Sequence, residues 1–179
     1  MYTEYEVRIL EINHDKMVKK LEDLKALKKF SALQRRYVYD FNPVKKSSWI
    51  MLRSNGKETT LTIKDIEAKT VDGTKELEIV VDDFDKTNLI LEKLGYKNRG
   101  YQENKRTQYI LDGVEIDLDK WPLIPEYMEI EGKDEESVYK TLEKLGIEKD
   151  KIVTLDVSSI YNKYGYDAMH DLNFEMEEK

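Results

Sequence analysis

The stretch Glu4-Tyr5-Glu6-Val7-Arg8 alternates charged and apolar side chains one residue at a time. Successive side chains of a β-strand point to opposite faces, so this alternation predicts a strand with one charged and one apolar face. Glu4, Glu6 and Arg8 share the charged face, and Tyr5 and Val7 lie on the other. The same alternation returns along most of the chain, and it decides the fold class that the sequence predicts.

Short alternating segments separated by turn residues are typical of antiparallel strands. The expected strands cover residues 3–12, 34–41, 48–54, 58–65, 75–82, 104–112, 114–119 and 126–131. Asn55-Gly56 and Asp112-Gly113 predict tight turns in two hairpins, because these residue types adopt positive φ readily. Eight strands are enough to close a barrel.

Helices are expected over residues 15–29, 85–94, 135–145 and, as a short one, 158–164. The first has an apolar stripe made of Met17, Leu21, Leu24 and Leu27. The expected helix ends are Asp85 and Asp134 as N-caps, and Gly95 and Gly146 after the C-termini. We expect one domain over residues 1–167 and an acidic C-terminal tail over 168–179, frayed from Asp171 onward.

Composition excludes several classes of protein. The chain has no cysteine, which removes disulfides, thiolate nucleophiles and Cys-ligated metals and favours a cytoplasmic setting. With His14 and His170 as the only histidines, a metal would be bound by carboxylates, as suits Mg²⁺, Mn²⁺ or Ca²⁺. A net charge of −7 weighs against nucleic-acid binding, and no apolar run approaches the roughly 20 residues of a membrane span.

Nearly all the charge of the expected strands falls on one face of each strand. The polar rows are Glu4, Glu6 and Arg8; Thr60, Thr62 and Lys64; Glu76 and Glu78; Asn104, Arg106 and Gln108; Glu115, Asp117 and Asp119; and Glu129 and Glu131. For a single strand, such a row is more often a solvated sheet face. If the sheet closes with helices outside, the rows line a lumen instead. Buried charges of both signs need partners or ligands, which suits a metal ion with a polyphosphate.

The same residues resemble the CYTH superfamily of triphosphate tunnel metalloenzymes. Residues 4–8 resemble its ExExK signature, with arginine in place of lysine, and residues 49–53 are similar to its WxRxR strand. Residues 61–64 resemble the family's LTxK strand, and residues 76–78 resemble its ExE strand. The segment IDLDKWP, which ends at Pro122, and residues 128–132 resemble its closing strands. The resemblance extends to about residue 165. It implies an α+β fold, an eight-stranded antiparallel closed β-barrel with a charged lumen and helices outside.

The resemblance also implies roles for individual residues. It implies metal ligation, by Mg²⁺ or Mn²⁺, at Glu4, Glu6, Asp117, Glu129 and Glu131. It implies phosphate binding by Arg8, Arg53, Lys64 and Arg106, to which we add Arg36 and Lys163, and catalytic acidic residues at Glu76 and Glu78. Two positions depart from the family pattern, since Met51 and Asn104 stand where cations are usual. Arg36, Arg99 or Lys105 could compensate.

Three functions are compatible with these residues. The first is metal-dependent hydrolysis of a triphosphate, namely tripolyphosphate, thiamine triphosphate or a nucleoside triphosphate such as ATP. The second is a class IV adenylyl cyclase, which makes cyclic AMP and pyrophosphate from ATP in the same kind of lumen. The third is a non-catalytic polyphosphate-binding module. We expect a monomer or homodimer that binds neither nucleic acid nor membrane.

Overall fold

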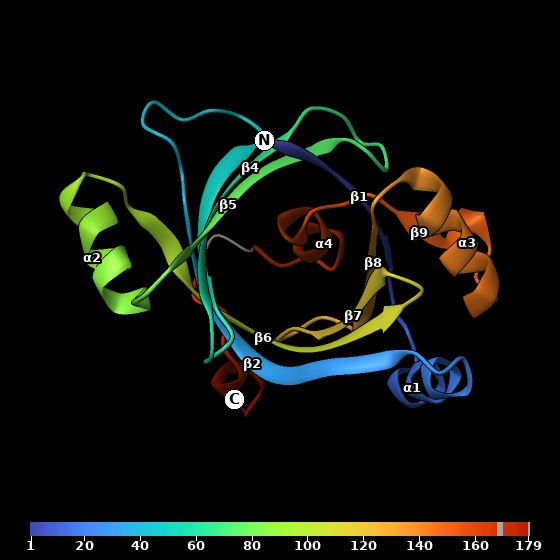
Figure 1. Cartoon of the computed structure of the whole chain (residues 1–179). Helices are drawn as coiled ribbons and strands as arrows, with labels where there is room; N and C mark the ends of the chain where they lie inside the picture. Colours follow the sequence, from blue (N-terminus) through green and yellow to red (C-terminus); the bar gives the residue numbers. More distant parts are fainter. Residues whose placement is uncertain (168–169, 179) are drawn as a thin grey trace.

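The strands form a closed antiparallel barrel, seen along its axis in Figure 1. The computed structural model describes residues 1–167 and 170–178. The barrel strands are β1 (Tyr2–Ile9), β2 (Leu27–Tyr39), β3 (Ser48–Ser54), β4 (Thr59–Ile66), β5 (Thr74–Val81), β6 (Asn98–Leu111), β7 (Val114–Lys120) and β8 (Tyr127–Gly132). They follow the order β5-β4-β3-β2-β6-β7-β8-β1, and β1 also pairs with β5, which closes the ring. The predicted eight-stranded barrel is confirmed.

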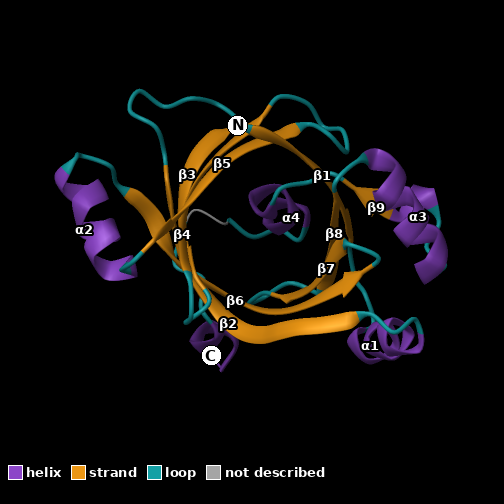
Figure 2. Cartoon of the chain, viewed as in Figure 1, coloured by secondary structure: helices purple, strands orange, loops and turns teal. Residues whose placement is uncertain are grey.

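Helices α1 (His14–Asp23), α2 (Phe84–Lys93) and α3 (Glu135–Leu145) cover the apolar outer face of the barrel (Figure 2). Helix α4 (Val157–Lys163) lies at one end of the barrel instead. Helices α1 and α3 pack over β1, β7 and β8, where Val7, Ile116 and Ile130 are fully buried. Helix α2 packs on β3 through Ile50 and Leu52. The apolar rows of the alternating strands therefore make the cores, which leaves the polar rows facing the lumen. None of the helices in the described residues has the length and apolarity needed to cross a membrane.

The chain after α3 returns to one end of the barrel. A two-residue strand, β9 (Ile152–Val153), pairs with Arg8 and Ile9 of β1, and α4 then lies across the barrel opening in Figure 1. Ile160 and Tyr161 of α4 are completely buried in a separate cluster. The side chains packed there are Trp121, Ile124, Tyr127 and Leu172. Helix α4 therefore caps one end of the lumen.

The first helix is shorter than the sequence predicts. The chain leaves α1 through Lys25, which has a φ of 59°, and its strand β2 begins already at Leu27. Leu27, expected on the apolar helix stripe, is a strand residue that is 62% exposed. Lysine-rich sequence favours a helix locally, but residues 27–33 pair with the far half of β6. Long-range strand pairing thus overrides local propensity, and β6 begins at Asn98 rather than 104 for the same reason.

The turns and caps mostly match the prediction. Asp112 and Gly113 have φ values of 53° and 83°, as a two-residue hairpin turn requires. Asp134 caps α3, with its carboxylate accepting from the Ser137 N–H at 2.8 Å. The predicted cap Asp85 is wrong, because Asp83 accepts from the Lys86 N–H at 2.9 Å and Asp85 lies inside the first turn.

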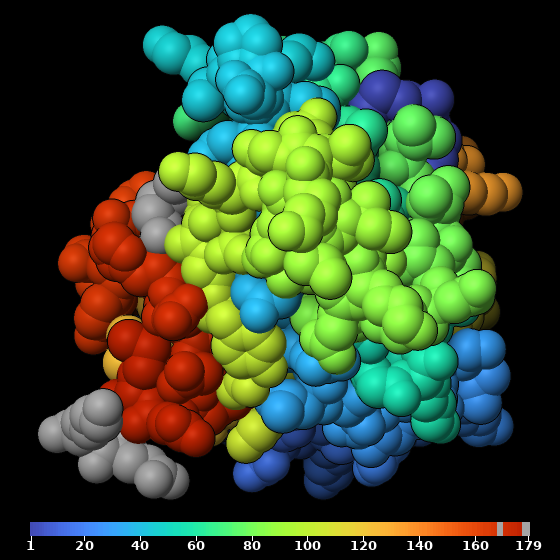
Figure 3. All heavy atoms as spheres, turned by 90° about the vertical axis from the view of Figure 1, so that its left-hand side faces the viewer, coloured from blue at the N-terminus to red at the C-terminus, as the bar shows by residue number. Residues whose placement is uncertain are grey.

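The acidic tail is partly ordered against the barrel. Residues 168, 169 and 179 of this tail lie outside the described residues. Leu172 is 2% exposed, and its backbone N–H donates to Tyr101 while its carbonyl accepts from Glu103. In Figure 3 the red C-terminal segment lies against the yellow-green part of the chain that contains the start of β6. The expectation that the tail frays from Asp171 is therefore wrong, because Leu172 supplies an apolar anchor.

Replacing Leu172 by alanine is expected to lower the free energy of unfolding by about 2–4 kcal/mol, because it empties a buried position under α4. Met176, which is 39% exposed, provides the matched control, and its replacement by alanine is expected to cost less than about 0.5 kcal/mol. Urea unfolding followed by circular dichroism measures both. Equal effects of the two substitutions would contradict an anchoring role for Leu172.

Candidate active site

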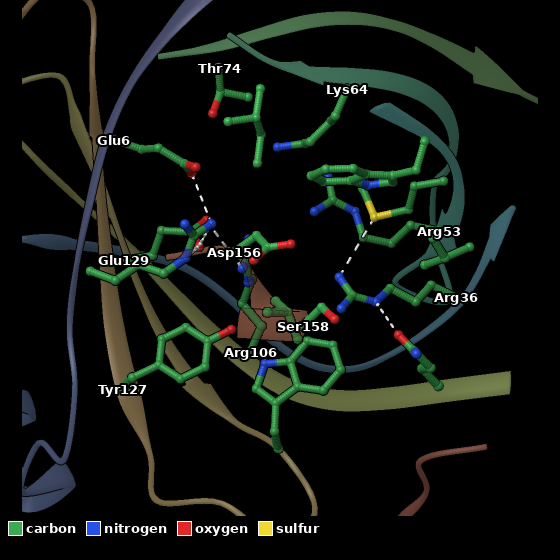
Figure 4. A pocket seen from close by; sticks show the side chains of 18 of the residues that line it. Glu6, Arg36, Arg53, Lys64, Thr74, Arg106, Tyr127, Glu129, Asp156 and Ser158 are labelled. Carbon is green, nitrogen blue, oxygen red and sulfur yellow. Dashed lines mark hydrogen bonds and ion pairs between the residues drawn. The ribbon is translucent and has the colours of Figure 1, made fainter. Parts of the chain in front are cut away.

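The lumen contains two connected chambers that differ in charge. The basic chamber lies next to α4, whose Val157 and Ser158 line it (Figure 4). Its volume, including space open to solvent, is about 880 Å³, and that of the acidic chamber is about 870 Å³. The two chambers share a boundary layer of four charged side chains, Arg53, Lys64, Arg106 and Glu129.

The two chambers separate positive from negative charge. Six cationic side chains line the basic chamber, namely Arg8, Arg36, Arg53, Lys64, Arg99 and Arg106. Its carboxylates are Glu6, Glu129 and Asp156. The acidic chamber is lined by the carboxylates of Glu4, Glu58, Glu76, Glu78, Glu115, Asp117, Glu129 and Glu131. A polyanion is therefore attracted to one chamber, and a divalent cation to the other.

Three carboxylates meet where the chambers join. Glu6, Glu129 and Glu131 each offer an oxygen, and these three oxygens lie within 4.8 Å of one another. The antiparallel register of β1 and β8 brings them together, because Glu6 lies opposite Glu131, and Arg8 lies opposite Glu129. We call these three residues the glutamate trio. An all-carboxylate set fits a hard cation such as Mg²⁺ or Mn²⁺.

The members of the trio have different electrostatic surroundings. Burial raises the pKa of Glu129, but the charges of Arg8 and Arg106 outweigh it and hold the pKa well below its ordinary value. Arg8 contacts both Glu129 at 2.6 Å and Glu6 at 3.1 Å. Glu131 has no ion pair among the described residues, and burial raises its pKa from 4.5 to about 7. Glu131 is thus the member with most to gain from a bound cation.

Metal binding at the trio is expected to depend on pH, because the proton of Glu131 competes with the cation. Its raised pKa means that the folded protein binds more protons than the unfolded chain between 4.5 and about 7. The metal-free protein should therefore lose stability as pH rises through this window. The rise in melting temperature on adding Mn²⁺ should be larger at about pH 8 than at about pH 6. Differential scanning fluorimetry measures it, and a larger rise at the lower pH would contradict the assignment.

Arg106 organises the carboxylates of β7. Its guanidinium donates two hydrogen bonds to Asp119, at 2.9 and 2.6 Å, and approaches Asp117 at 2.6 Å and Glu129 at 3.4 Å. Asp119 is fully buried and also accepts from Asn104 at 2.9 Å. Oδ1 of Asp117 has no hydrogen-bond partner among the described residues, and burial raises the pKa of Asp117 to about 7. Asp117 lies near Arg106 rather than in the trio.

Glu4 lies away from the trio, on the side of Lys64. The Lys64 ammonium contacts Glu4 at 3.0 Å and Glu76 at 2.8 Å, which lie on the paired strands β1 and β5. Burial raises the pKa of Glu4 to about 9, against the lowering effect of Lys64. Glu78 accepts from the Thr62 hydroxyl at 2.7 Å and lies 3.7 Å from Arg53. Glu4, Glu76 and Glu78, all predicted site residues, therefore line the acidic chamber. The nearby cations Lys64 and Arg53 are already paired with these carboxylates.

Arg36 differs from the other cations of the lumen. It donates to Gln102 at 3.2 Å and to the sulfur of Met51 at 3.6 Å, and it stacks 4.2 Å over the ring of Trp121. No carboxylate pairs with it in the part of the chain that the structure describes. Burial, with the nearby charges of Arg53 and Arg106, lowers its pKa to about 10. Within the described residues, Arg36 is therefore a cation that lacks an anion (Figure 4).

A family model for the CYTH domain matches residues 3–155, a span that includes all the barrel strands except Tyr2, the first residue of β1. The chain belongs to the CYTH domain family. No curated protein sequence matches it at a significant level.

Solved structures share this CYTH barrel. The PH1012 protein of Pyrococcus horikoshii has 21% identity, a TM-score of 0.76, and coverage of 88% of this chain and 98% of its own. A proposed adenylate cyclase of Vibrio parahaemolyticus has 14% identity, a TM-score of 0.77, and coverage of 90% and 98%. The Hippeastrum protein HpAC1 has 15% identity, a TM-score of 0.63, and coverage of 93% and 97%. At these identities the likeness is one of fold.

The two departures from the CYTH pattern lie beside Arg36 and Arg106. Met51 faces the basic chamber and accepts from Arg36, which lies directly across from Arg53 on the neighbouring strand. Arg36 thus brings a cation into the space beside Met51. Of the other candidates for compensation, Arg99 lines the basic chamber but pairs with Asp40, and Lys105 is exposed over the ring of Phe174. Lys163 is also exposed and is not among the residues that line the two chambers.

Several lumen residues of this CYTH barrel were not predicted as site residues. Asp119, the bidentate partner of Arg106, lies two positions after Asp117 in the same polar row. Trp121 and Tyr127 line the basic chamber and are each 1% exposed. Trp121 follows Asp119 by two positions and Tyr127 precedes Glu129 by two, so each continues the lumen-facing row of its strand by one step. The alternation of the sequence therefore indicated their place. An aromatic residue at such a position is also typical of a packed core, so the alternation alone does not assign it a role in binding.

Proposed function

We propose that this protein hydrolyses a triphosphate with the help of a divalent metal ion in its lumen. One observation carries the proposal: the glutamate trio adjoins a chamber that holds six cationic side chains. Arg8 connects the two parts, because it contacts two members of the trio and also lines the basic chamber. Metal and phosphate ligands are thus arranged to meet one bound substrate.

The chain's own residues would divide the work. Arg36 and Arg53 would bind phosphate oxygens. Arg36 has no carboxylate partner in the described residues, and Arg53 makes only a long contact, of 3.7 Å, with Glu78. Glu6, Glu129 and Glu131 would hold Mg²⁺ or Mn²⁺, which neutralises phosphate charge and activates water when bound. Glu76 and Glu78 remain predictions as acidic residues that orient this water. Lys64 and Arg106 would keep the carboxylates of the acidic chamber from repelling the substrate.

The nature of the substrate is the finer part of the proposal. The Hippeastrum protein HpAC1, itself a proposed adenylyl cyclase, has a dominant triphosphatase activity. We take this as support for hydrolysis over cyclisation here. The cyclase keeps a specific observation in its favour, because a third cavity adjoins the basic chamber through Trp49 and Arg99 and leaves room for an organic group.

An assay of the purified protein decides among these functions. It is incubated with Mg²⁺ or Mn²⁺ and, in turn, with tripolyphosphate, thiamine triphosphate and ATP, while phosphate, pyrophosphate and cyclic AMP are measured. Hydrolysis predicts phosphate release that stops when the metal is chelated. Cyclic AMP with pyrophosphate would favour the cyclase instead. Tight binding of tripolyphosphate without turnover would favour a polyphosphate-binding module.

A further inference from the structure

Two buried hydrogen-bond donors at the capped end of the basic chamber lack an acceptor. They are the indole Nε1–H of Trp121 and the hydroxyl of Tyr127, and neither has a hydrogen-bond partner among the described residues. Both side chains are 1% exposed, and both line the chamber. Buried polar groups in folded proteins nearly always have a partner. Their missing partner is therefore to be sought in the chamber itself.

The nearest carboxylates do not fill this role. Tyr127 lies opposite Asp119 across β7 and β8 and two residues before Glu129. Arg106 and Asn104 already donate to Asp119, and Arg8 and Arg106 donate to Glu129. Both carboxylates thus already accept charged hydrogen bonds from arginines, and neither accepts from the Tyr127 hydroxyl. Figure 4 shows Tyr127 with its hydroxyl directed toward the interior of the chamber.

Cations flank both donors. The ring of Trp121 lies 4.2 Å below the guanidinium of Arg36, which has no carboxylate partner in the described residues. Arg8 and Arg106 line the same chamber and donate to Glu129, which lies two residues after Tyr127 on β8. A negatively charged acceptor would suit both these donors and the arginines around them.

We propose that Trp121 and Tyr127 are phosphate-binding residues, whose N–H and O–H donate to oxygens of the substrate that Arg36, Arg8 and Arg106 attract. The inference rests on the proposed function and deepens it by adding two neutral donors to the phosphate site. Neutral donors fix the position of an oxygen without adding charge. They would thereby favour one placement of a phosphate group at the end that α4 caps.

The indole N–H signals of the folded protein provide a direct test. The chain has 2 tryptophans, so ¹H–¹⁵N spectra contain two indole signals, and Trp49→Phe identifies the one from Trp121. Tripolyphosphate is added with a chelator present, which prevents metal-dependent turnover. The proposal predicts a downfield shift of the Trp121 proton as the new hydrogen bond forms. If calorimetry records binding but the Trp121 signal does not move, the proposal is overturned, because the indole N–H then donates to water rather than to phosphate.

Affinity measurements test the hydroxyl. Tyr127→Phe is expected to weaken tripolyphosphate binding about tenfold, as the loss of a hydrogen bond to a charged group implies. Tyr161→Phe is the matched control, because its hydroxyl donates to the Pro122 carbonyl at 2.8 Å in the neighbouring cluster and does not line the chamber. Equal affinities of the two variants would overturn the role of Tyr127. If the unaltered protein itself does not bind tripolyphosphate, the proposed function fails, which is a separate result.

Discussion

Replacing Glu131 by glutamine is expected to reduce metal-dependent phosphate release by about a thousandfold, because it removes one of three carboxylates that can meet on a cation. Glutamine keeps the shape of the side chain. Glu131 has no ion pair among the described residues, so the fold should be retained, and the metal-free protein should become slightly more stable at neutral pH. Initial rates, and melting temperatures with and without Mn²⁺, measure both effects.

A carboxylate of the same chamber supplies the control for this substitution. Glu58 lines the acidic chamber at the exposed turn between β3 and β4, outside the glutamate trio. Glu58→Gln is expected to keep both the activity and the stabilisation by Mn²⁺. If E131Q retains full activity with unchanged metal dependence, the glutamate trio is not the metal site. If both variants lose activity equally, the loss reflects the charge of the chamber rather than coordination.

Replacing Arg36 by methionine is expected to raise the KM for the triphosphate roughly 10- to 100-fold, because this removes a charge-assisted phosphate contact. Arg36 has no carboxylate partner in the described residues and lies near two other cations. The free energy of unfolding should therefore change by less than about 1 kcal/mol. Steady-state kinetics and urea unfolding measure these two quantities separately.

The same substitution at Arg106 should behave differently. Arg106 contacts Asp117, Asp119 and Glu129, and its removal leaves these buried carboxylates short of a cation. We expect R106M to lose about 3–5 kcal/mol of stability in addition to its activity. Loss of stability in R36M comparable to that in R106M would contradict the role of Arg36 as a cation kept for the substrate.

The alternation of charged and apolar residues predicted the barrel because it is a local property. Each strand exposes its own two rows, as Glu4, Glu6 and Arg8 do, and no knowledge of distant residues is needed to sort them. The same rule, extended by one step, would have placed Trp121 and Tyr127 in the lumen. Aromatic residues at strand ends are more often part of a core, however, so their place in the row does not by itself distinguish binding from packing.

The pairing of charges could not be predicted in the same way. It depends on register between strands far apart in sequence, which sets Glu6 opposite Glu131 and places Lys64 between Glu4 and Glu76. The two glutamates of residues 4–8 therefore have different surroundings, because Glu6 belongs to the glutamate trio and Glu4 lies beside Lys64. Non-local pairing also explains why Leu27 is in a strand although its lysine-rich surroundings favour a helix.

Crystals grown with Mn²⁺ and a non-hydrolysable imido analogue of tripolyphosphate would place the metal and the phosphates in a single experiment. Anomalous scattering locates the metal independently of the protein density. We expect Mn²⁺ coordinated by Glu6, Glu129 and Glu131 and bridging to phosphates that lie among Arg8, Arg36 and Arg53. Manganese bound elsewhere, or an analogue bound outside the barrel while the protein remains an active triphosphatase, would contradict the proposed metal and phosphate sites.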